Sequence, residues 1–129
     1  MTQNARVSKI SVWTGRILSV LLALMLIFSA AMKFAQPPEV VKGFEHLGIP
    51  MRLAIGIGIV EVACAIIYLI PQTAVLGAIL ITGYLGGATL THLRVGDSFI
   101  MPILLGVVAW IAVFLRDPRV RALVPLRRL

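Results

Sequence analysis

The sequence predicts an all-α integral membrane protein, a four-helix bundle with a short interfacial helix between the first two transmembrane helices. Hydrophobic residues make up 60% of the 129 residues, and charged residues make up 13%, about half the share in an ordinary soluble domain. A soluble domain of this size keeps much of its surface in water and could not hide so much apolar area. The chain also contains four separate apolar stretches, each close to the length that spans a lipid bilayer.

The four apolar stretches cover residues 16–34, 51–70, 73–91 and 99–115. Each approaches the roughly 20 residues that cross a hydrocarbon core of about 30 Å. They are continuously apolar rather than alternating, which favours helices over the strands of a barrel, since those are only about ten residues long. The length accommodates one domain, residues 1–129.

An alternative for the first stretch is a cleaved signal peptide, because Arg6, Lys9 and Arg16 precede an apolar run that ends in small residues. The run is long for a signal peptide, and Lys33 and Phe34 continue it. Its removal would also leave three helices, with the two termini on opposite faces. We therefore expect this stretch to be a transmembrane helix of the folded protein.

Basic residues are divided unequally between the two ends of the predicted bundle. The side that holds both termini carries one acidic residue, Asp117, and the basic residues Arg6, Lys9, Arg16, Arg116, Arg119, Arg121, Arg127 and Arg128. The opposite side carries the remaining four of the 12 basic residues, together with three acidic ones. The positive-inside rule therefore predicts a protein of the cell (inner) membrane with both termini in the cytoplasm. Nucleic-acid binding is not expected, because the basic residues flank apolar spans and lack interleaved aromatic residues.

Residues 39–47 predict the short interfacial helix. Pro38 suits its first turn, and Gly48 suits its C-terminal cap. The apolar residues that fall on one face are Val40, Val41, Phe44 and Leu47. Such a helix lies flat at the external interface, with its apolar face in lipid or over the end of the bundle. We expect the second arrangement, in which the helix caps the bundle.

Glu61 places a carboxylate near the middle of the bilayer. It lies about ten residues from either end of the second span, which is roughly 15 Å from each surface. An uncompensated charge at this depth is costly, so Glu61 is expected to face the bundle interior and either find a cation or stay protonated. The small or polar residues that share its helix face are Ala54, Gly58, Ala65 and Tyr68. Bulky residues suited to lipid occupy another face, namely Ile55, Ile59, Val62, Ile66 and Leu69.

The third span predicts a matching small-residue surface around Gly83 and Gly87, which form a GxxxG pair. Tyr84 lies at about the depth of Glu61 and is expected to donate a hydrogen bond to it. The same glycines offer an alternative use, the association of two copies of the chain into a homo-oligomer.

Several polar residues lie near the external ends of the spans, among them Lys33, His92 and Arg94. One interpretation joins them to Glu61 and Tyr84 in a pocket that binds a ligand or relays protons. The alternative is that Lys33 and Arg94 extend to the interface, as long basic side chains do, and that Glu61 is structural. No catalytic residue and no metal-ligand cluster is evident, and Cys64 is the only cysteine.

A series of different short motifs is spread along most of the chain. In order, they are SAAMKF at 29–34, LGIP at 47–50, Glu61, IPQT at 70–73, the glycine-rich segment 77–88, THLRVGD at 91–97 and LRDPR at 115–119. Their order and spacing, over residues 16–125, resemble the DoxX-like family of small four-helix membrane proteins within the DoxX/DoxD group. The polar positions that match the family pattern are Lys33, Glu61, His92 and Arg94.

The resemblance implies a non-catalytic accessory subunit of a membrane oxidoreductase, in which a quinone or lipid is bound and a redox enzyme is the partner. The group is named after a subunit of a quinol oxidase complex. Haem is not expected, because His46 and His92 both lie on the outer side. The chain is therefore not expected to be an enzyme on its own.

Two alternatives belong to other functional classes. The first is a small proton-coupled transporter with Glu61 as the coupling carboxylate. Small multidrug exporters use such a residue, but theirs lies in the first span and Glu61 lies in the second. The second alternative is a membrane scaffold or lipid-binding protein without turnover, whose partner is the lipid bilayer itself.

Overall fold

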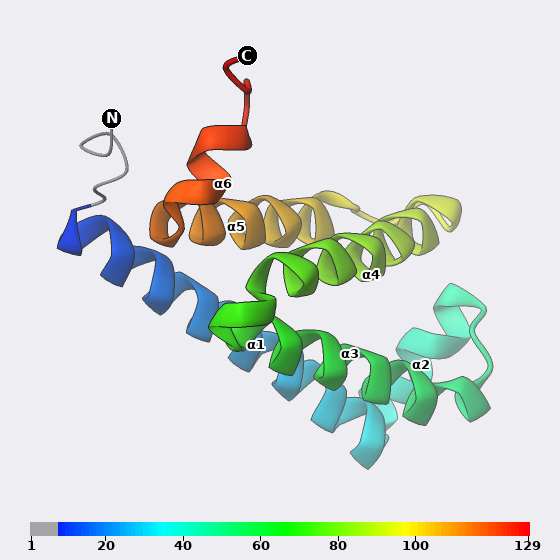
Figure 1. The fold of residues 1–129 in the computed structure, drawn as a ribbon. Helices are drawn as coiled ribbons and strands as arrows, with labels where there is room; N and C mark the ends of the chain where they lie inside the picture. The colour runs from blue at the N-terminus through cyan, green and yellow to red at the C-terminus, as the bar shows by residue number, and fades with distance from the viewer. Residues whose placement is uncertain (1–7) are drawn as a thin grey trace.

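The computed structural model describes residues 8–129, which form helices and contain no strand (Figure 1). The four long helices are α1 (Lys9–Ala35), α3 (Ala54–Leu69), α4 (Ala74–Arg94) and α5 (Ile100–Arg116). The shorter elements are α2 (Pro38–Leu47), α6 (Pro118–Leu123) and the single turns η2 (Met51–Leu53) and η3 (Pro71–Thr73). The predicted all-α fold class is confirmed for these residues.

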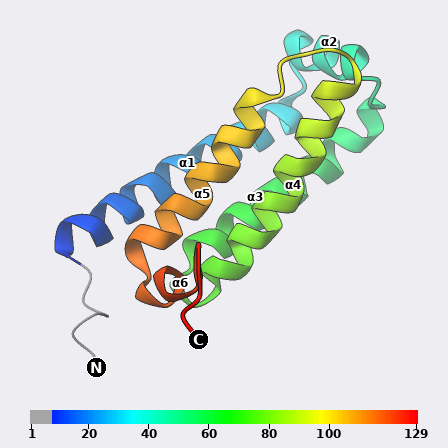
Figure 2. The ribbon, with the colours of Figure 1, turned by 90° about the horizontal axis from the view of Figure 1, so that it is seen from above.

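The long helices form a closed ring in which each packs against two others, in the order α1, α3, α4, α5 (Figure 2). Two layers result, one of α1 and α3 and the other of α4 and α5. The layers lie close together near η3 and α6 and diverge toward the end of the molecule that α2 covers (Figure 1). The bundle is therefore tightly packed at one end and open at the other.

Local sequence signals explain where the helices near the open end begin and stop. α1 ends at Gln36, whose left-handed backbone (φ 53°) and the prolines that follow it turn the chain. Pro38 occupies the first turn of α2, where its missing N–H is not needed. Gly48 ends α2 in the left-handed conformation (φ 73°) and donates its N–H to the Glu45 carbonyl. The predicted helix at 39–47 and both of its boundary signals are confirmed.

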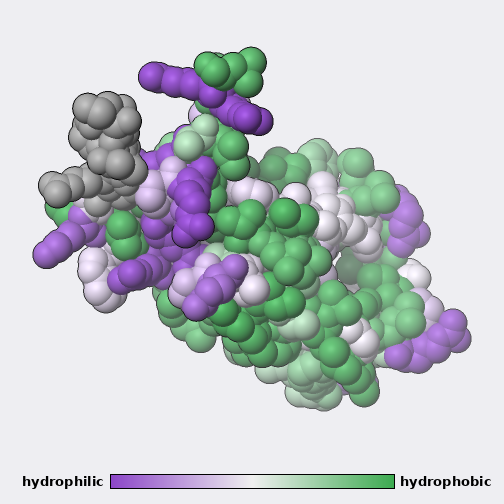
Figure 3. Space-filling view, viewed as in Figure 1, coloured by the Kyte–Doolittle hydropathy of each residue, from purple (hydrophilic) through white to green (hydrophobic). Residues whose placement is uncertain are grey.

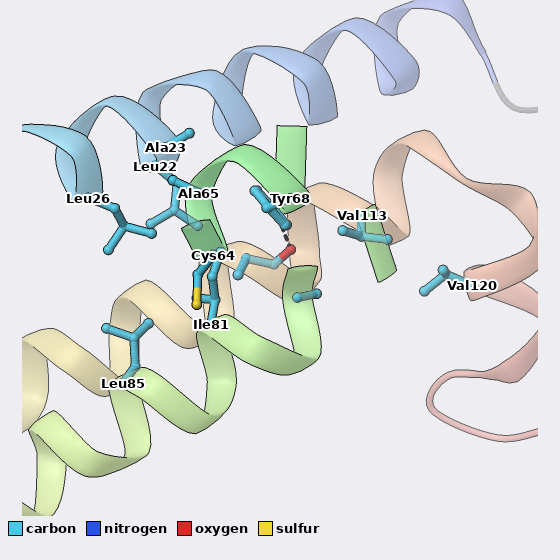
Figure 4. Close-up of a cluster of buried hydrophobic side chains, with 12 residues drawn as sticks. Leu22, Ala23, Leu26, Cys64, Ala65, Tyr68, Ile81, Leu85, Val113 and Val120 are labelled. Atoms are coloured by element: carbon cyan, nitrogen blue, oxygen red, sulfur yellow. Dashed lines mark hydrogen bonds between the residues drawn. The ribbon is translucent and has the colours of Figure 1, made fainter. Parts of the chain in front are cut away.

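Side chains from all four long helices form the hydrophobic core, part of which is shown in Figure 4. Tyr68 is its largest fully buried side chain, and its hydroxyl donates a hydrogen bond of 2.8 Å to the Ala109 carbonyl of α5. This bond crosses the ring from α3 to α5 and satisfies a hydroxyl that would otherwise be costly to bury. α1 contributes Leu22 and Leu26 to the same core, as expected of a helix that belongs to the folded bundle.

The two predicted faces of α3 are confirmed. The small and polar residues of the Glu61 face are all buried, namely Ala54, Gly58, Ala65 and Tyr68. Three residues of the bulky face, Ile55, Ile59 and Ile66, are exposed. Lipid accepts exposed isoleucines of this kind, since its hydrocarbon chains are as apolar as they are.

The glycines that bring α3 and α4 together differ from the predicted pair. A Cβ atom on Gly77 would clash with the backbone of Tyr68, whereas a Cβ on Gly83 or Gly87 would meet nothing within 4 Å. The prediction that Gly83 and Gly87 match the surface of α3 is therefore wrong. Both glycines line a cavity of the bundle instead, and association of two copies through them stays a prediction.

Three helical segments are long and apolar enough to cross a membrane: Lys9–Ala35, Met51–Leu69 and Pro71–Arg94. α5 is a shorter apolar helix of 17 residues. Side chains around the middle of the molecule are mainly hydrophobic, and hydrophilic ones gather at the two ends (Figure 3). The first helix begins at Lys9 rather than at residue 16, and the other predicted spans agree within a few residues. Arg6, one of the basic residues used to predict the orientation, lies outside the described residues.

Replacing Gly77 with alanine should lower the thermal stability of the protein in detergent. The added methyl group overpacks the α3–α4 contact, which typically costs about 1–3 kcal/mol. Gly83→Ala is the matched control, because its methyl group enters open space on the same helix. Equal melting temperatures for the two variants, measured by circular dichroism, would contradict this description of the contact.

Candidate functional site

A cavity of about 960 Å³ lies at the open end of the bundle, between the two helix layers and α2. In Figure 3 the surface is hollowed between the layers toward this end. Most of the lining is apolar and includes Met25 and Phe28 of α1, Val40 and Phe44 of α2, Ile57 of α3, Leu85 and Ala88 of α4, and Met101 and Leu105 of α5. We call this space the α2 cavity.

An ion pair between α1 and α3 forms part of the cavity wall. Lys33 Nζ lies 2.9 Å from Glu61 Oε1, and the two side chains are only 15% and 3% exposed. The same ammonium group donates a hydrogen bond of 2.7 Å to the Ser29 hydroxyl, one helical turn earlier on α1. Since Ser29 and Lys33 are four residues apart, both lie on the face of α1 that is turned toward Glu61. Sequence reasoning did not identify Ser29.

This arrangement decides between the two states that the sequence left open for Glu61. The carboxylate has a cationic partner, and Lys33 turns inward rather than extending to the interface. The opposite charge within reach explains the inward turn. Removing one partner of a buried pair typically costs about 3–5 kcal/mol, because the other charge is left uncompensated in an apolar medium.

The ion pair keeps unused hydrogen-bonding capacity. An ammonium group has three N–H donors, and Lys33 uses two of them, toward Ser29 and Glu61. Lys33 binds one carboxylate oxygen of Glu61, and an ionised carboxylate has further lone pairs that can accept hydrogen bonds. Both side chains line the α2 cavity. One donor and one acceptor are thus available to a molecule inside it.

Tyr84 and His92 line the same cavity from α4. Tyr84 is half-buried and lies beside the Glu61 carboxylate. A hydrogen bond between them stays a prediction. His92, one turn before the end of α4, lies nearer the mouth, where its Nδ1 is 3.6 Å from Asp97 Oδ2.

Arg94 does not line the cavity. Its guanidinium group donates to the Leu47 carbonyl and lies against Gly48, so it holds the C-terminal end of α2 against α4. The structure therefore brings together Lys33, Glu61, Tyr84 and His92 and separates Arg94 from them. Four of the five candidate residues therefore line one cavity, and Arg94 lies outside it.

A second polar cluster at this end joins α2 to the connection between α4 and α5. His46 Nε2 lies 2.9 and 2.8 Å from the two carboxylate oxygens of Asp97, and His92 approaches one of the same oxygens. The hydrogen bond from His46 holds the pKa of Asp97 below its ordinary value, with a smaller contribution from His92. The sequence placed both histidines on the outer side, but gave no sign that one aspartate would join them.

Residues 8–129 contain no group of three or more His, Cys, Asp or Glu side chains that is placed to hold a metal ion. Cys64 is buried in the core, away from the two histidines.

The DoxX-like family model matches residues 17–113, about three quarters of the chain. The chain belongs to the DoxX-like family. This membership and the apolar helices indicate a membrane protein. A search of curated proteins and a search of solved structures each found no match. The matched range contains Lys33, Glu61, Tyr84 and His92 and ends before α6.

Proposed function

We propose that the protein spans the inner membrane four times, through α1, α3, α4 and α5, and that α2 lies at the external interface. α5 has 17 residues and still falls within the range of about 17–25 that crosses a bilayer. Its contacts with both α1 and α4 support placing it at the same depth as these two helices. The apolar face of α2 is turned toward the bundle, where Phe44 is buried.

The charges support an orientation with the η3–α6 end in the cytoplasm. Of the described basic residues, seven belong to this end: Lys9, Arg16, Arg116, Arg119, Arg121, Arg127 and Arg128. Arg116 and Arg121 also donate to main-chain carbonyls at the ends of α3 and α5. Such clusters favour the cytoplasmic side because anionic lipids and the insertion machinery retain them there.

Single cysteines introduced into a Cys64→Ala background test this topology. A membrane-impermeant maleimide applied to intact cells should label Lys42→Cys and Ser98→Cys. It should label Gln72→Cys and Leu126→Cys only after the membrane is opened. All four positions are exposed, so their accessibility depends on the side of the membrane on which they lie. Labelling of Gln72→Cys together with Lys42→Cys in intact cells would contradict the four-span arrangement.

We further propose that the protein binds a membrane quinone in the α2 cavity as a non-catalytic accessory subunit of an oxidoreductase. The observation that carries this proposal is the ion pair with spare donor and acceptor capacity inside an otherwise apolar cavity. A quinone head group has carbonyl oxygens that accept a hydrogen bond from Lys33, and its reduced form has hydroxyl groups that donate to Glu61. Its hydrocarbon tail suits the apolar lining, and the volume lies within the range of small-molecule pockets, about 300–1,000 Å³.

The arrangement disfavours the transporter alternative. Proton coupling needs a carboxylate that exchanges its proton readily, and Glu61 is held by Lys33. A scaffold that retains an ordinary phospholipid would use the same apolar walls, so the identity of the bound molecule separates that alternative from quinone binding. Copurification of a redox enzyme in mild detergent would support the accessory role.

Glu61→Gln should keep the fold and weaken binding of the reduced quinone, measured with a short-chain ubiquinol and the purified protein in detergent. Loss of a hydrogen bond to a charged group typically costs about 1.5–3 kcal/mol, so the dissociation constant should rise roughly tenfold or more. Arg119→Gln is the control, because that side chain is 94% exposed at the opposite end of the molecule.

Equal affinity of Glu61→Gln and the wild-type protein would show that the ion pair does not take part in binding the ligand. Absence of saturable quinone binding, with phospholipid retained in the purified protein, would instead favour the lipid-binding scaffold.

A further inference from the structure

α2 closes the outer end of the α2 cavity. Its apolar face supplies Val40, Phe44 and Leu47 to the lining, and Phe44 is the residue of this helix that is buried. α2 lies across the end of the bundle rather than within the ring of long helices (Figure 2). A ligand that enters from the external interface must therefore pass α2 or displace it.

Both ends of α2 are built as turning points. Gln36, in the left-handed conformation, and Pro37 precede the helix, and Gly48, also left-handed, follows it. The backbone of α2 makes few contacts with the long helices compared with the contacts among the long helices themselves. Segments with few packed contacts and capped ends open at low free-energy cost. The geometry is that of a short rigid helix between two hinges.

Polar contacts hold α2 against the rest of the protein. His46, on its last turn, contacts the carboxylate of Asp97 in the α4–α5 connection, and His92 of α4 lies 3.6 Å from the same carboxylate. Arg94 donates to the Leu47 carbonyl at the end of the helix. The first of these attachments contains two groups that titrate near neutral pH, whereas the arginine stays charged.

We propose that α2 is a lid over the α2 cavity, held closed by the charged His46–Asp97–His92 cluster, and that it opens as the two histidines lose their protons. As a description of access to the proposed quinone site, this inference rests on that function. The lid itself is a property of the protein without ligand and is tested separately.

The pH range in which the lid is held closed follows from the carboxylate and the two histidines of the cluster. The pKa of Asp97 is lowered from its ordinary value of 3.8, so its contribution is present above that value and is lost as the pH falls through the lower folded value. Histidine ordinarily loses its proton near pH 6.5, and a charged hydrogen bond is about twice as strong as a neutral one. The lid is therefore held most firmly at mildly acidic pH, where Asp97 is ionised and a histidine carries its proton, and is released as the pH rises through neutrality.

Other charged groups near the cluster do not account for the pH dependence of lid closure. Arg94 keeps its charge throughout the range. Four other charged residues belong to α2 and η2: Glu39, Lys42, Glu45 and Arg52. None of them forms an ion pair within the described part of the chain.

Hydrogen–deuterium exchange of the α2 amides, in protein without quinone in lipid nanodiscs, tests the lid. After correction for intrinsic exchange rates, protection of these amides should fall roughly two- to fivefold between pH 5.5 and pH 7.5, the range expected for exposed ion pairs. Amides at the middle of α3 should keep their protection and serve as the internal reference.

Asp97→Asn should lower α2 protection at pH 5.5 to the value seen at pH 7.5 and abolish its pH dependence. Glu45→Gln, which removes a carboxylate of the same helix that makes no ion pair, should behave like the wild-type protein. The proposal is overturned if wild-type α2 protection is independent of pH, or if the dependence persists in Asp97→Asn. Loss of quinone binding with an intact pH dependence would refute the proposed function and leave the lid in place.

Discussion

The ion pair between Lys33 and Glu61 is the interaction on which the open half of this protein depends. A carboxylate in the apolar middle of a helix bundle needs a compensating charge, and Lys33 supplies it from the last turn of α1. The pair therefore fixes how α1 and α3 are placed beside each other. It also puts a donor and an acceptor inside a space that is otherwise lined by apolar side chains, which gives the cavity a polar end.

The two ends of the bundle follow different packing rules. At the η3–α6 end, Gly15 and Gly77 let helix backbones approach closely, and the Tyr68 hydroxyl links α3 to α5. Close backbone approach is the main source of helix association in lipid, where no hydrophobic gain drives it. At the other end the layers separate, and α2 and the ion pair replace direct packing. A tight end that fixes the geometry and an open end that holds a cavity are what a small membrane binding protein requires.

Much of this organisation was predictable from the sequence, and the parts that were not share a physical reason. Helical periodicity identified the buried face of α3, and Pro38 and Gly48 identified the ends of α2, because these signals are local. The partner of Glu61 depends on how two distant helices are turned, so the sequence left a cation and a bound proton as alternatives. Gly83 and Gly87 have the spacing of a contact, but a Cβ atom on either would meet nothing within 4 Å. The His46–Asp97–His92 cluster joins residues 51 positions apart and has no local signature.

Infrared spectroscopy of the protein in lipid nanodiscs at pH 6 tests the ion pair most directly. The account predicts that the wild-type protein shows the bands of an ionised Glu61 carboxylate, assigned by difference from Glu61→Gln. In Lys33→Met the carboxyl group should become protonated, and its carbonyl band should vanish when Glu61→Gln is added. A protonated Glu61 band of the same strength in the wild-type protein and in Lys33→Met would contradict the ion pair and the polar cavity built on it.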